Sequence, residues 1–424
     1  MERTDPHYQE DLSILHEELI PAEGCTEPIA VAYAAAKARA LLAEPVARCR
    51  LLVSGPIIKN VKSVVIPHTD GQKGLKAAVA AGILGGDADA GLEVLSHVGV
   101  TEQREIPAFL DAHEIDIRAA ENDIPFYIDL TLFGESHSAR VVIQDAHTNI
   151  TRLERDGAVL SASSGAFGGT SRTDRGVLNV RDILDFAETV DIADVQPVIG
   201  RMVALNSAIS EEGLRGEWGA QIGKTLLACC GEDVYMRARA AAAAGSDARM
   251  SGCELPVVIA SGSGNQGITC SMPVVTYARH LGSSEERLTR ALVLSALVTV
   301  HQKTRIGPVS AFCGAVCAGV GAGCGVAFLQ GADLSAINHT IVNAIAICSG
   351  MVCDGAKPSC AAKISVAVDA GLLGYGMYCR NQQFRRGEGI VKRDVEHTIE
   401  AVCDMAHNGM KQTDKRILEI MLEE

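Results

Sequence analysis

Apolar residues near the start of the chain recur at the spacing of a helix. Leu12, Leu15 and Leu19 fall on one face of such a helix, and the alanine-rich residues 29–42 continue as a second helix. Between them the chain reads PAEGCTEP, where a glycine and a cysteine precede a threonine, a glutamate and a proline. We therefore predict two helices joined by a short segment that contains Cys25.

The pattern changes after about residue 49. Residues 49–61 predict a strand that ends in a loop, and residues 75–86 predict a helix ended by glycines. Three further stretches alternate apolar and polar residues, with short polar breaks between them: residues 125–134, 137–146 and 149–157. These stretches predict an antiparallel meander, and so a region of mixed α and β structure.

Helical patterns return after residues 161–174, a stretch rich in Ser, Gly and Thr that we interpret as a linker or an active-site flap. Residues 179–245 and most of 284–424 are helical in pattern, with glycine-rich breaks at 261–267 and 307–325. The predicted fold class is α+β. We divide the chain into a mostly helical catalytic domain, interrupted by an inserted α+β domain with an antiparallel sheet: residues 1–45 plus 175–424, and residues 46–174.

The composition describes a globular protein that repels nucleic acid. Apolar residues make up 47% of the 424 residues, too many for a disordered chain, and the net charge of −14 has the sign of a phosphate backbone. The charged N-terminus lacks an apolar signal core, so we expect a soluble cytoplasmic protein whose 14 cysteines are thiols or metal ligands. Residues 306–332 carry no charge, but their glycines and Pro308 indicate buried backbone and no membrane span.

Cys25 is the first candidate for chemistry. Thr26 or Glu27 can cap the following helix, and Pro28 suits its first turn. The positive end of the helix dipole stabilises a thiolate, so this position predicts a pKa below the ordinary value of about 8.5. Such a thiolate could act as nucleophile, metal ligand or base. An inert buried cysteine is the alternative.

The C-terminal third contains a second group of cysteines. Cys313, Cys317 and Cys324 would share one face if their glycine-rich run were a continuous helix, which we do not expect. Cys353 and Cys360 bracket a stretch with loop residues, and a loop can wrap a metal. Their separation suits an iron-sulfur site better than a zinc ribbon. The alternative is that these cysteines are small packing residues.

Two further motifs could bind a substrate. Residues 260–270 contain three glycines in a pattern typical of an anion-binding nest, to which Asn265 and Gln266 add side-chain donors; a simple tight turn is the alternative. Lys59 and Asn60 follow an apolar pair, where a lysine could meet a carboxylate or could merely be solvated. The histidines form no pair at metal-ligand spacing, and we interpret His301 and His339 as hydrogen-bonded structural residues.

Taken together, these motifs resemble those of the iron-sulfur L-cysteine desulfidases, relatives of the bacterial iron-sulfur L-serine dehydratases. The similarity covers EGCTEP, IIKNV, SGSGNQG and the three cysteines 313, 353 and 360, in the order of the family and over essentially the whole chain. Its most specific part is the cysteine spacing, because 353 − 313 = 40 and 360 − 353 = 7 match the family's cluster-binding set.

The resemblance implies a lyase that converts L-cysteine to hydrogen sulfide, ammonia and pyruvate. It implies that Cys313, Cys353 and Cys360 hold three irons of a [4Fe-4S] cluster and that Cys25 is the catalytic base, and also an occasional ligand of the fourth iron. Asn265 and Gln266 would then bind the substrate carboxylate. Cys317 and Cys324 become packing residues, and Lys59 and Asn60 are substrate-binding candidates without a defined role.

Three alternatives remain open at the level of sequence. L-serine dehydration is the nearest, although EGCTEP differs from the serine-rich, histidine-containing loop of the dehydratases. A pyridoxal phosphate enzyme with Lys357 as Schiff base is the second, and a non-catalytic iron-sulfur or cysteine sensor is the third. We expect a small amino-acid substrate and no nucleic acid or membrane partner; a homodimer is the assembly left open.

Overall fold

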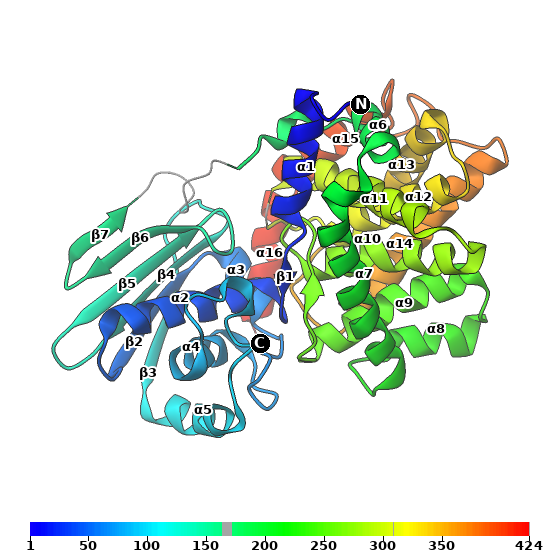
Figure 1. Ribbon diagram of the computed structural model, residues 1–424. Coiled ribbons are helices and arrows are strands. Elements are labelled where there is room, and N and C mark those ends of the chain that lie inside the picture. Colours follow the sequence, from blue (N-terminus) through cyan, green and yellow to red (C-terminus); the bar gives the residue numbers. More distant parts are fainter. Residues whose placement is uncertain (163–171, 308, 424) are drawn as a thin grey trace.

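The computed structural model describes residues 1–162, 172–307 and 309–423. It is mostly helical with one six-stranded sheet, which confirms the predicted α+β class. Figure 1 shows the sheet and its helices on one side of the molecule and the larger group of helices on the other. Most of the predicted linker or flap at 161–174 lies outside the described residues.

The sheet has the order β3-β2-β4-β5-β6-β7. The predicted meander is confirmed by β4, β5 and β6, which are antiparallel neighbours. One pair, β2 with β3, is parallel, which the alternation did not indicate because strand direction depends on the long connection between them. The strands are β2 (Arg48–Val53), β3 (Glu114–Ala119), β4 (Tyr127–Phe133), β5 (Ser138–Gln144), β6 (Ile150–Arg155) and β7 (Ala158–Ala162).

The alanine-rich helix α2 (Thr26–Leu42) packs on this sheet against β4 and β5, and also on helix α4 (Gly74–Gly85). A side chain on Gly82 would collide with the backbone of Ala32, so small residues let α2 and α4 approach closely. The predicted division of the chain assigned α2 to the helical domain, whereas α2 packs on the sheet. The domain boundaries themselves remain a prediction.

Residues 55–61 form a helix, α3 (Gly55–Val61), and not the predicted loop. The apolar pair Ile57 and Ile58 resembles the end of a strand, but Pro56 stands in the first turn of a helix, where its missing N–H costs nothing. Helix α3 contacts α16 (Lys411–Leu422), which lies between the sheet and the other helices in Figure 1. Residues 59 and 60 therefore lie where the two parts of the molecule meet.

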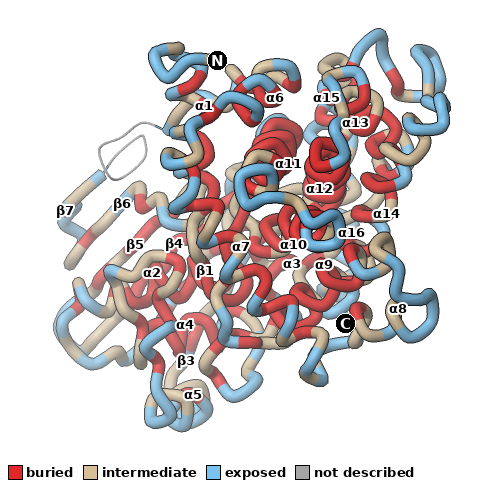
Figure 2. The backbone as a smooth tube through the Cα atoms, turned by 45° about the vertical axis from the view of Figure 1, so that its right-hand side comes forward, coloured by how far each residue is buried: buried red, intermediate tan, exposed pale blue. Residues whose placement is uncertain are grey.

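The helical part surrounds α11 and α12, whose backbone is buried along nearly its whole length in Figure 2. Among the described residues no helix combines the length and apolarity that a membrane crossing requires. Helix α5 (Val100–Ala112) belongs to the sheet side, and a two-residue pair, β1 (Pro21–Ala22) with β8 (Val257–Val258), joins distant segments. The remaining helices are α1 (Pro6–Glu18), α6 (Val180–Thr189), α7 (Ile192–Arg215), α8 (Ile222–Cys230), α9 (Val234–Met250), α10 (Gly264–Leu281), α11 (Glu285–Ile306), α12 (Gly314–Leu329), α13 (Leu334–Cys348), α14 (Cys360–Cys379) and α15 (Val395–Asp404).

The glycine-rich run that we did not expect to be helical is the continuous helix α12. Its glycines lower helix propensity, but they allow backbone-to-backbone contact with neighbouring helices. A Cβ on Gly323 would lie 2.5 Å from the carbonyl oxygen of Gly371 in α14. Close packing on several sides outweighs the propensity, so the prediction was wrong because it weighed only local sequence.

We expect Gly323→Ala to lower the free energy of unfolding by about 1–3 kcal/mol, the usual cost of overpacking a core. Gly376→Ala is the matched control, because it lies on α14 and a Cβ added there would have no atom within 4 Å. That substitution should stabilise the helix by up to about 1 kcal/mol. Urea unfolding of both variants measures the difference, and equal stability would contradict the packing explanation.

Candidate active site

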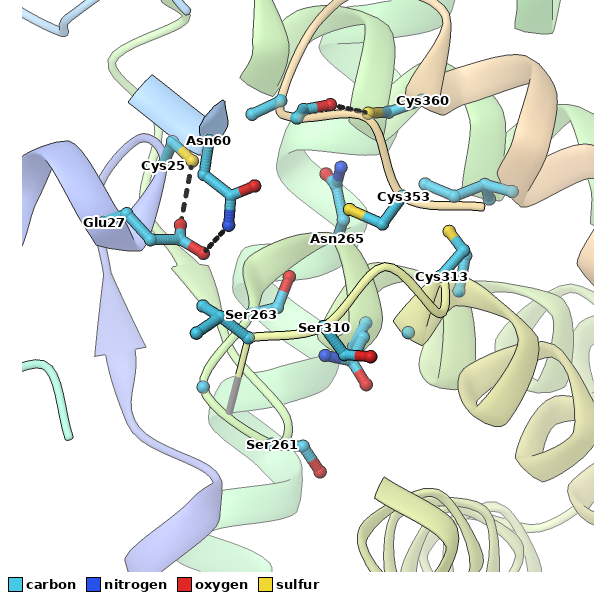
Figure 3. A pocket seen from close by; sticks show the side chains of 18 of the residues that line it. Cys25, Glu27, Asn60, Ser261, Ser263, Asn265, Ser310, Cys313, Cys353 and Cys360 are labelled. Atoms are coloured by element: carbon cyan, nitrogen blue, oxygen red, sulfur yellow. Dashed lines mark hydrogen bonds between the residues drawn. The ribbon is translucent and has the colours of Figure 1, made fainter. Parts of the chain in front are cut away.

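The ends of several distant segments line one cavity of about 110 Å³. It is bounded by the start of α2, by α3, by the end of α9 and by the turn before α10, and on its other side by the segment before α12 and the loop before α14. Figure 3 shows Cys25, Glu27 and Asn60 on one side and Cys313, Cys353 and Cys360 on the other, with Asn265 between them. The structure thus brings together seven of the eight predicted site residues: Cys25, Asn60, Asn265, Gln266, Cys313, Cys353 and Cys360.

Main-chain pairing positions two of the three cysteines. Cys313 is the N-cap of α12, and its N–H donates to the carbonyl of Met351 at 3.1 Å. The N–H of Cys353 donates to the carbonyl of Ala311 at 2.6 Å. These bonds hold the segment before α12 beside the segment before α14, so residues 40 positions apart in sequence become neighbours.

Cys360 is the first residue of α14, and its thiol donates to the carbonyl of Gly355 at 3.6 Å. Burial raises the pKa of Cys313 and of Cys360, and a charge on Cys353 raises both further. The three thiols are therefore close enough to repel one another as thiolates. A bound cation is what would stabilise them together as anions.

Within the described ranges, no group of three or more His, Cys, Asp or Glu side chains is arranged to hold one metal ion. This result addresses a single ion, whose ligands all converge on one centre. In an iron-sulfur cluster each cysteine binds a different iron, so the thiols lie around a larger body. A shared cavity wall with three separate thiols fits that geometry.

Cys25 is the N-cap of α2, a position for which the sequence indicated Thr26 or Glu27, and the predicted low pKa of its thiol is wrong. Burial raises the pKa of this thiol well above its ordinary value, and the negative charge of Glu27 raises it further, against a smaller opposite effect of Arg249. The thiol donates to Oε2 of Glu27 at 3.2 Å. Desolvation outweighs the helix dipole here, because the side chain is removed from water.

Glu27 links helix α2 to helix α3 through its hydrogen bonds. Its Oε1 accepts from Nδ2 of Asn60 at 2.9 Å, and its Oε2 accepts from the hydroxyl of Thr26 at 3.2 Å as well as from Cys25. Despite its burial, the pKa of Glu27 is lowered, and His147 and Cys25 are the main stabilising neighbours. The sequence suggested Glu27 only as a helix cap, whereas in the structure it positions the Cys25 thiol.

Arg249, at the end of α9, is the main residue that the sequence did not identify. It is 2% exposed, its Nη1 donates to Oδ1 of Asn265 at 3.1 Å, and its Nε and Nη2 have no hydrogen-bond partner among the described residues. Buried acceptors and hydroxyls without a partner lie in the same cavity wall: Asn60 Oδ1, Ser261 Oγ and Gln266 Oε1. The only signal for Arg249 in the sequence was an arginine that follows an alanine-rich stretch.

A buried guanidinium with two unpaired donors destabilises the fold unless a ligand accepts hydrogen bonds from them. The carboxylate of an amino acid matches its forked geometry. Asn265 and Gln266 lie in the first turn of α10, which adds backbone donors and a positive dipole end. The cavity can therefore bind a small polar molecule that carries a carboxylate.

Lys59 is the predicted site residue that lies outside the cavity lining. Its side chain is 1% exposed, pairs with Asp414 of α16 and donates to the carbonyl of Cys353 at 3.1 Å. Lys59 therefore supports the Cys353 loop from behind. Cys317 and Cys324 lie buried within α12, and His301 binds Glu396 at 2.8 Å, as expected of structural residues.

The fold and the site together define the class of protein: it is mostly helical, and four cysteines and a buried arginine line one cavity. A family model described as "Serine dehydratase alpha chain" matches residues 89–419, well over half of the chain. The chain therefore belongs to the serine dehydratase alpha chain family. The match contains Arg249, Asn265 and the three downstream cysteines, and it begins after Cys25.

Full-length relatives extend the similarity to the N-terminal segment. A UPF0597 protein of Desulfitobacterium hafniense is 52% identical over 100% of this chain and 99% of its own length. UPF0597 proteins of Lachnoclostridium phytofermentans and Finegoldia magna are 45% and 44% identical, over 98% and 97% of this chain and over 100% and 98% of their own lengths. The first of these matches spans the whole chain, and the other two span nearly all of it.

Proposed function

We propose that this protein is a lyase that removes the β-substituent of a small amino acid, and that its substrate is L-cysteine. Membership of the serine dehydratase alpha chain family supports the β-elimination class. The observation that carries the proposal is one cavity in which Cys25 faces three cysteines across a buried, incompletely bonded Arg249. The products would be hydrogen sulfide, ammonia and pyruvate.

Cys313, Cys353 and Cys360 would hold a [4Fe-4S] cluster. Their donor chemistry fits, because three thiols share a wall and Lys363 lies behind it, donating to the carbonyl of Val352 at 2.9 Å. When bound, such a cluster would supply a Lewis-acidic iron beside the substrate, worth several kcal/mol of charge stabilisation. Lys59 and Lys363 keep the ligand loop in place through their bonds to its carbonyl groups.

The substrate carboxylate would bind Nε and Nη2 of Arg249, with the side chain of Asn265 orienting the guanidinium through Nη1. Gln266 and Asn60 each present an oxygen without a partner, and either can accept from the substrate ammonium group. These contacts would fix three points of the amino acid. Its Cα–H bond can then be held in one orientation relative to Cys25.

Cys25 and Glu27 would share one proton along their hydrogen bond. The raised pKa of Cys25 and the lowered pKa of Glu27 place that proton on Cys25 in the free site. Once Glu27 has accepted the shared proton, Sγ of Cys25 would become the base that takes the proton from Cα. The electron pair of the Cα–H bond forms the Cα=Cβ bond, and the Cβ–S pair leaves with sulfur. Sulfur departs as HS⁻, which takes up a proton, and the aminoacrylate product becomes an imine that water hydrolyses to pyruvate and ammonia.

The test is anaerobic cluster reconstitution followed by sulfide, pyruvate and ammonia assays with L-cysteine and L-serine in parallel. We expect sulfide and pyruvate in equal amounts from L-cysteine. Pyruvate from serine without sulfide from cysteine would reject cysteine as substrate and retain the lyase. L-serine dehydration is the second candidate, because the family model carries the serine dehydratase description.

The other two alternatives give distinct results in the same experiment. A pyridoxal phosphate enzyme would contain no iron or acid-labile sulfide, and its proposed Lys357 donates to the carbonyls of Asp354 and Gly355 at 3.2 and 3.1 Å. Those bonds hold the lysine on its own loop. A sensor would bind cysteine without forming pyruvate.

The role of Arg249 predicts a large effect on substrate use. We expect Arg249→Met to lower kcat/KM, with a loss of about 2–5 kcal/mol of transition-state stabilisation. That is the usual cost, about 2–5 kcal/mol, of removing one member of a buried charge pair. Most of the change should appear in KM if the arginine binds the carboxylate in the ground state. Steady-state assays of the reconstituted enzyme measure both constants.

Arg239→Met is the matched control for that prediction. Arg239 lies on the same helix α9, but its side chain pairs with Asp369 at 3.0 Å and bonds Ser365, outside the cavity lining. Its loss should change stability and leave KM within about twofold. Equal KM values for the two variants would contradict carboxylate binding by Arg249.

A further inference from the structure

A second cavity lies at the far end of α14 from the candidate active site. It has a volume of about 320 Å³ and is lined by the loop between α14 and α15 together with residues of α13. Helix α14 begins at Cys360 and ends at Cys379, a length of roughly 30 Å for its 20 residues. The two cavities share no lining residue, so the second is a separate feature of the fold.

The loop has a charge opposite to that of the whole chain. Residues 380–394 contain five arginines and lysines and two acidic residues, Glu388 and Asp394, in a protein of net charge −14, and Asp394 pairs with Arg393 at 3.4 Å. Arg385, Arg386 and Lys392 line the cavity, and among the described residues none of them has a carboxylate within 4.0 Å of its charged group. Their charges are available to an anion.

Hydrogen bonds at both ends hold this loop in one conformation. The N–H of Phe384 donates to Oδ1 of Asn343 on α13 at 3.0 Å, and the N–H of Lys392 donates to the hydroxyl of Thr398 on α15 at 3.1 Å. Between them the N–H of Gly387 donates to the carbonyl of Val391 at 3.1 Å. A loop fixed in this way loses little further entropy when a ligand binds.

Two residues that line the cavity carry polar atoms without hydrogen-bond partners in the described part of the chain. Oδ1 of Asn338 and Nδ1 of His339 are buried and make no hydrogen bond to any described residue. The His339 ring is held by stacking on Tyr378, with centroids 5.6 Å apart and planes 17° apart. A ligand that combines a hydrogen-bond donor with anionic oxygens would satisfy both atoms and the basic side chains of the loop.

We propose that this cavity binds a small molecule that carries a phosphate or polyphosphate group. The arginine fork matches phosphate oxygens in pairs, and the volume is that of a small-molecule site. A nucleic-acid chain is disfavoured, because the basic loop is small and the rest of the surface is acidic. The proposal does not depend on the reaction catalysed in the first cavity.

The test measures binding of tripolyphosphate to the reconstituted enzyme by calorimetry. We expect the double substitution Arg385→Gln with Arg386→Gln to weaken binding by about tenfold or more, because both charge-assisted contacts are lost. The control is Lys76→Gln with Arg104→Gln, which removes the same charge from exposed sites on α4 and α5. That change should alter affinity by less than about twofold.

A third variant separates a built site from a diffuse charge effect. His339→Phe retains the aromatic stack on Tyr378 and removes the ring nitrogens, and we expect it to weaken tripolyphosphate binding by about threefold or more. Equal affinity in all variants, or no binding to the unmodified enzyme at millimolar tripolyphosphate, would overturn the proposal. Binding of a single-stranded oligonucleotide that tripolyphosphate cannot displace would also overturn it.

Discussion

Cys353→Ser should abolish both the iron-sulfur cluster and turnover. A serine hydroxyl is a poor iron ligand at neutral pH, and Cys353 lies in the cavity wall between the Cys313 and Cys360 segments. We expect iron and acid-labile sulfide to fall to background after anaerobic reconstitution, and pyruvate formation to fall with them. Thermal unfolding of the protein without iron should change little, because Cys353 is only half-buried.

Cys317→Ser is the control for this experiment. Cys317 is 2% exposed within α12 and lies outside the cavity lining, so the variant should retain cluster and turnover with a small loss of stability. The reverse result, with the cluster lost at Cys317 and unaffected at Cys353, would support a metal site along the face of α12. The pair of variants therefore distinguishes the cavity cysteines from the cysteines that share a helix face.

Cys25→Ser should leave the cluster intact and reduce turnover by about 10²–10⁴-fold, the usual contribution of a positioned general base. The serine hydroxyl can still donate to Glu27, but it is far less acidic than a thiol. Iron content and visible absorbance measure the cluster, and pyruvate formation with L-cysteine measures turnover. KM should change little if Arg249 supplies most of the ground-state binding.

Cys253→Ser serves as the matched control, since Cys253 is equally buried at 4% exposure and lies outside the cavity lining. It should retain both cluster and activity. Turnover above about a tenth of the unmodified rate in Cys25→Ser would be too high for loss of the general base. Loss of cluster in that variant would instead point to Cys25 as a required iron ligand.

Local patterns were sufficient to predict many of the elements. The alternation of β4, β5 and β6 and the amphipathic helices after residue 179 are confirmed. Two predictions of element type failed: α12 is helical despite its glycines, and residues 55–61 are helical despite a strand-like apolar pair, with Pro56 in the first helical turn. For α12, contacts with neighbouring helices outweigh short-range preference.

The candidate site shows the same division between what local sequence predicts and what tertiary contacts decide. Cys313, Cys353 and Cys360 were identified by their spacing in a family resemblance, and the structure shows the main-chain bonds that bring the Cys313 and Cys353 segments side by side. Lys59 was predicted beside the substrate, but its ammonium group supports the Cys353 loop. The sequence did not identify Arg249, because its importance comes from burial beside residues more than 200 positions away.

By itself the sequence determined the α+β class, most element types and the residues with reactive side chains, because periodicity and side-chain chemistry are local properties. Tertiary structure alone decided which of these residues share a cavity and in which direction the pKa of each buried group is shifted. Cys25 is the clearest case: its place at the start of α2 predicted an easily formed thiolate, yet burial and the neighbouring Glu27 raise the pKa of its thiol. Desolvation depends on every element that surrounds a group, and no single segment of sequence contains that information.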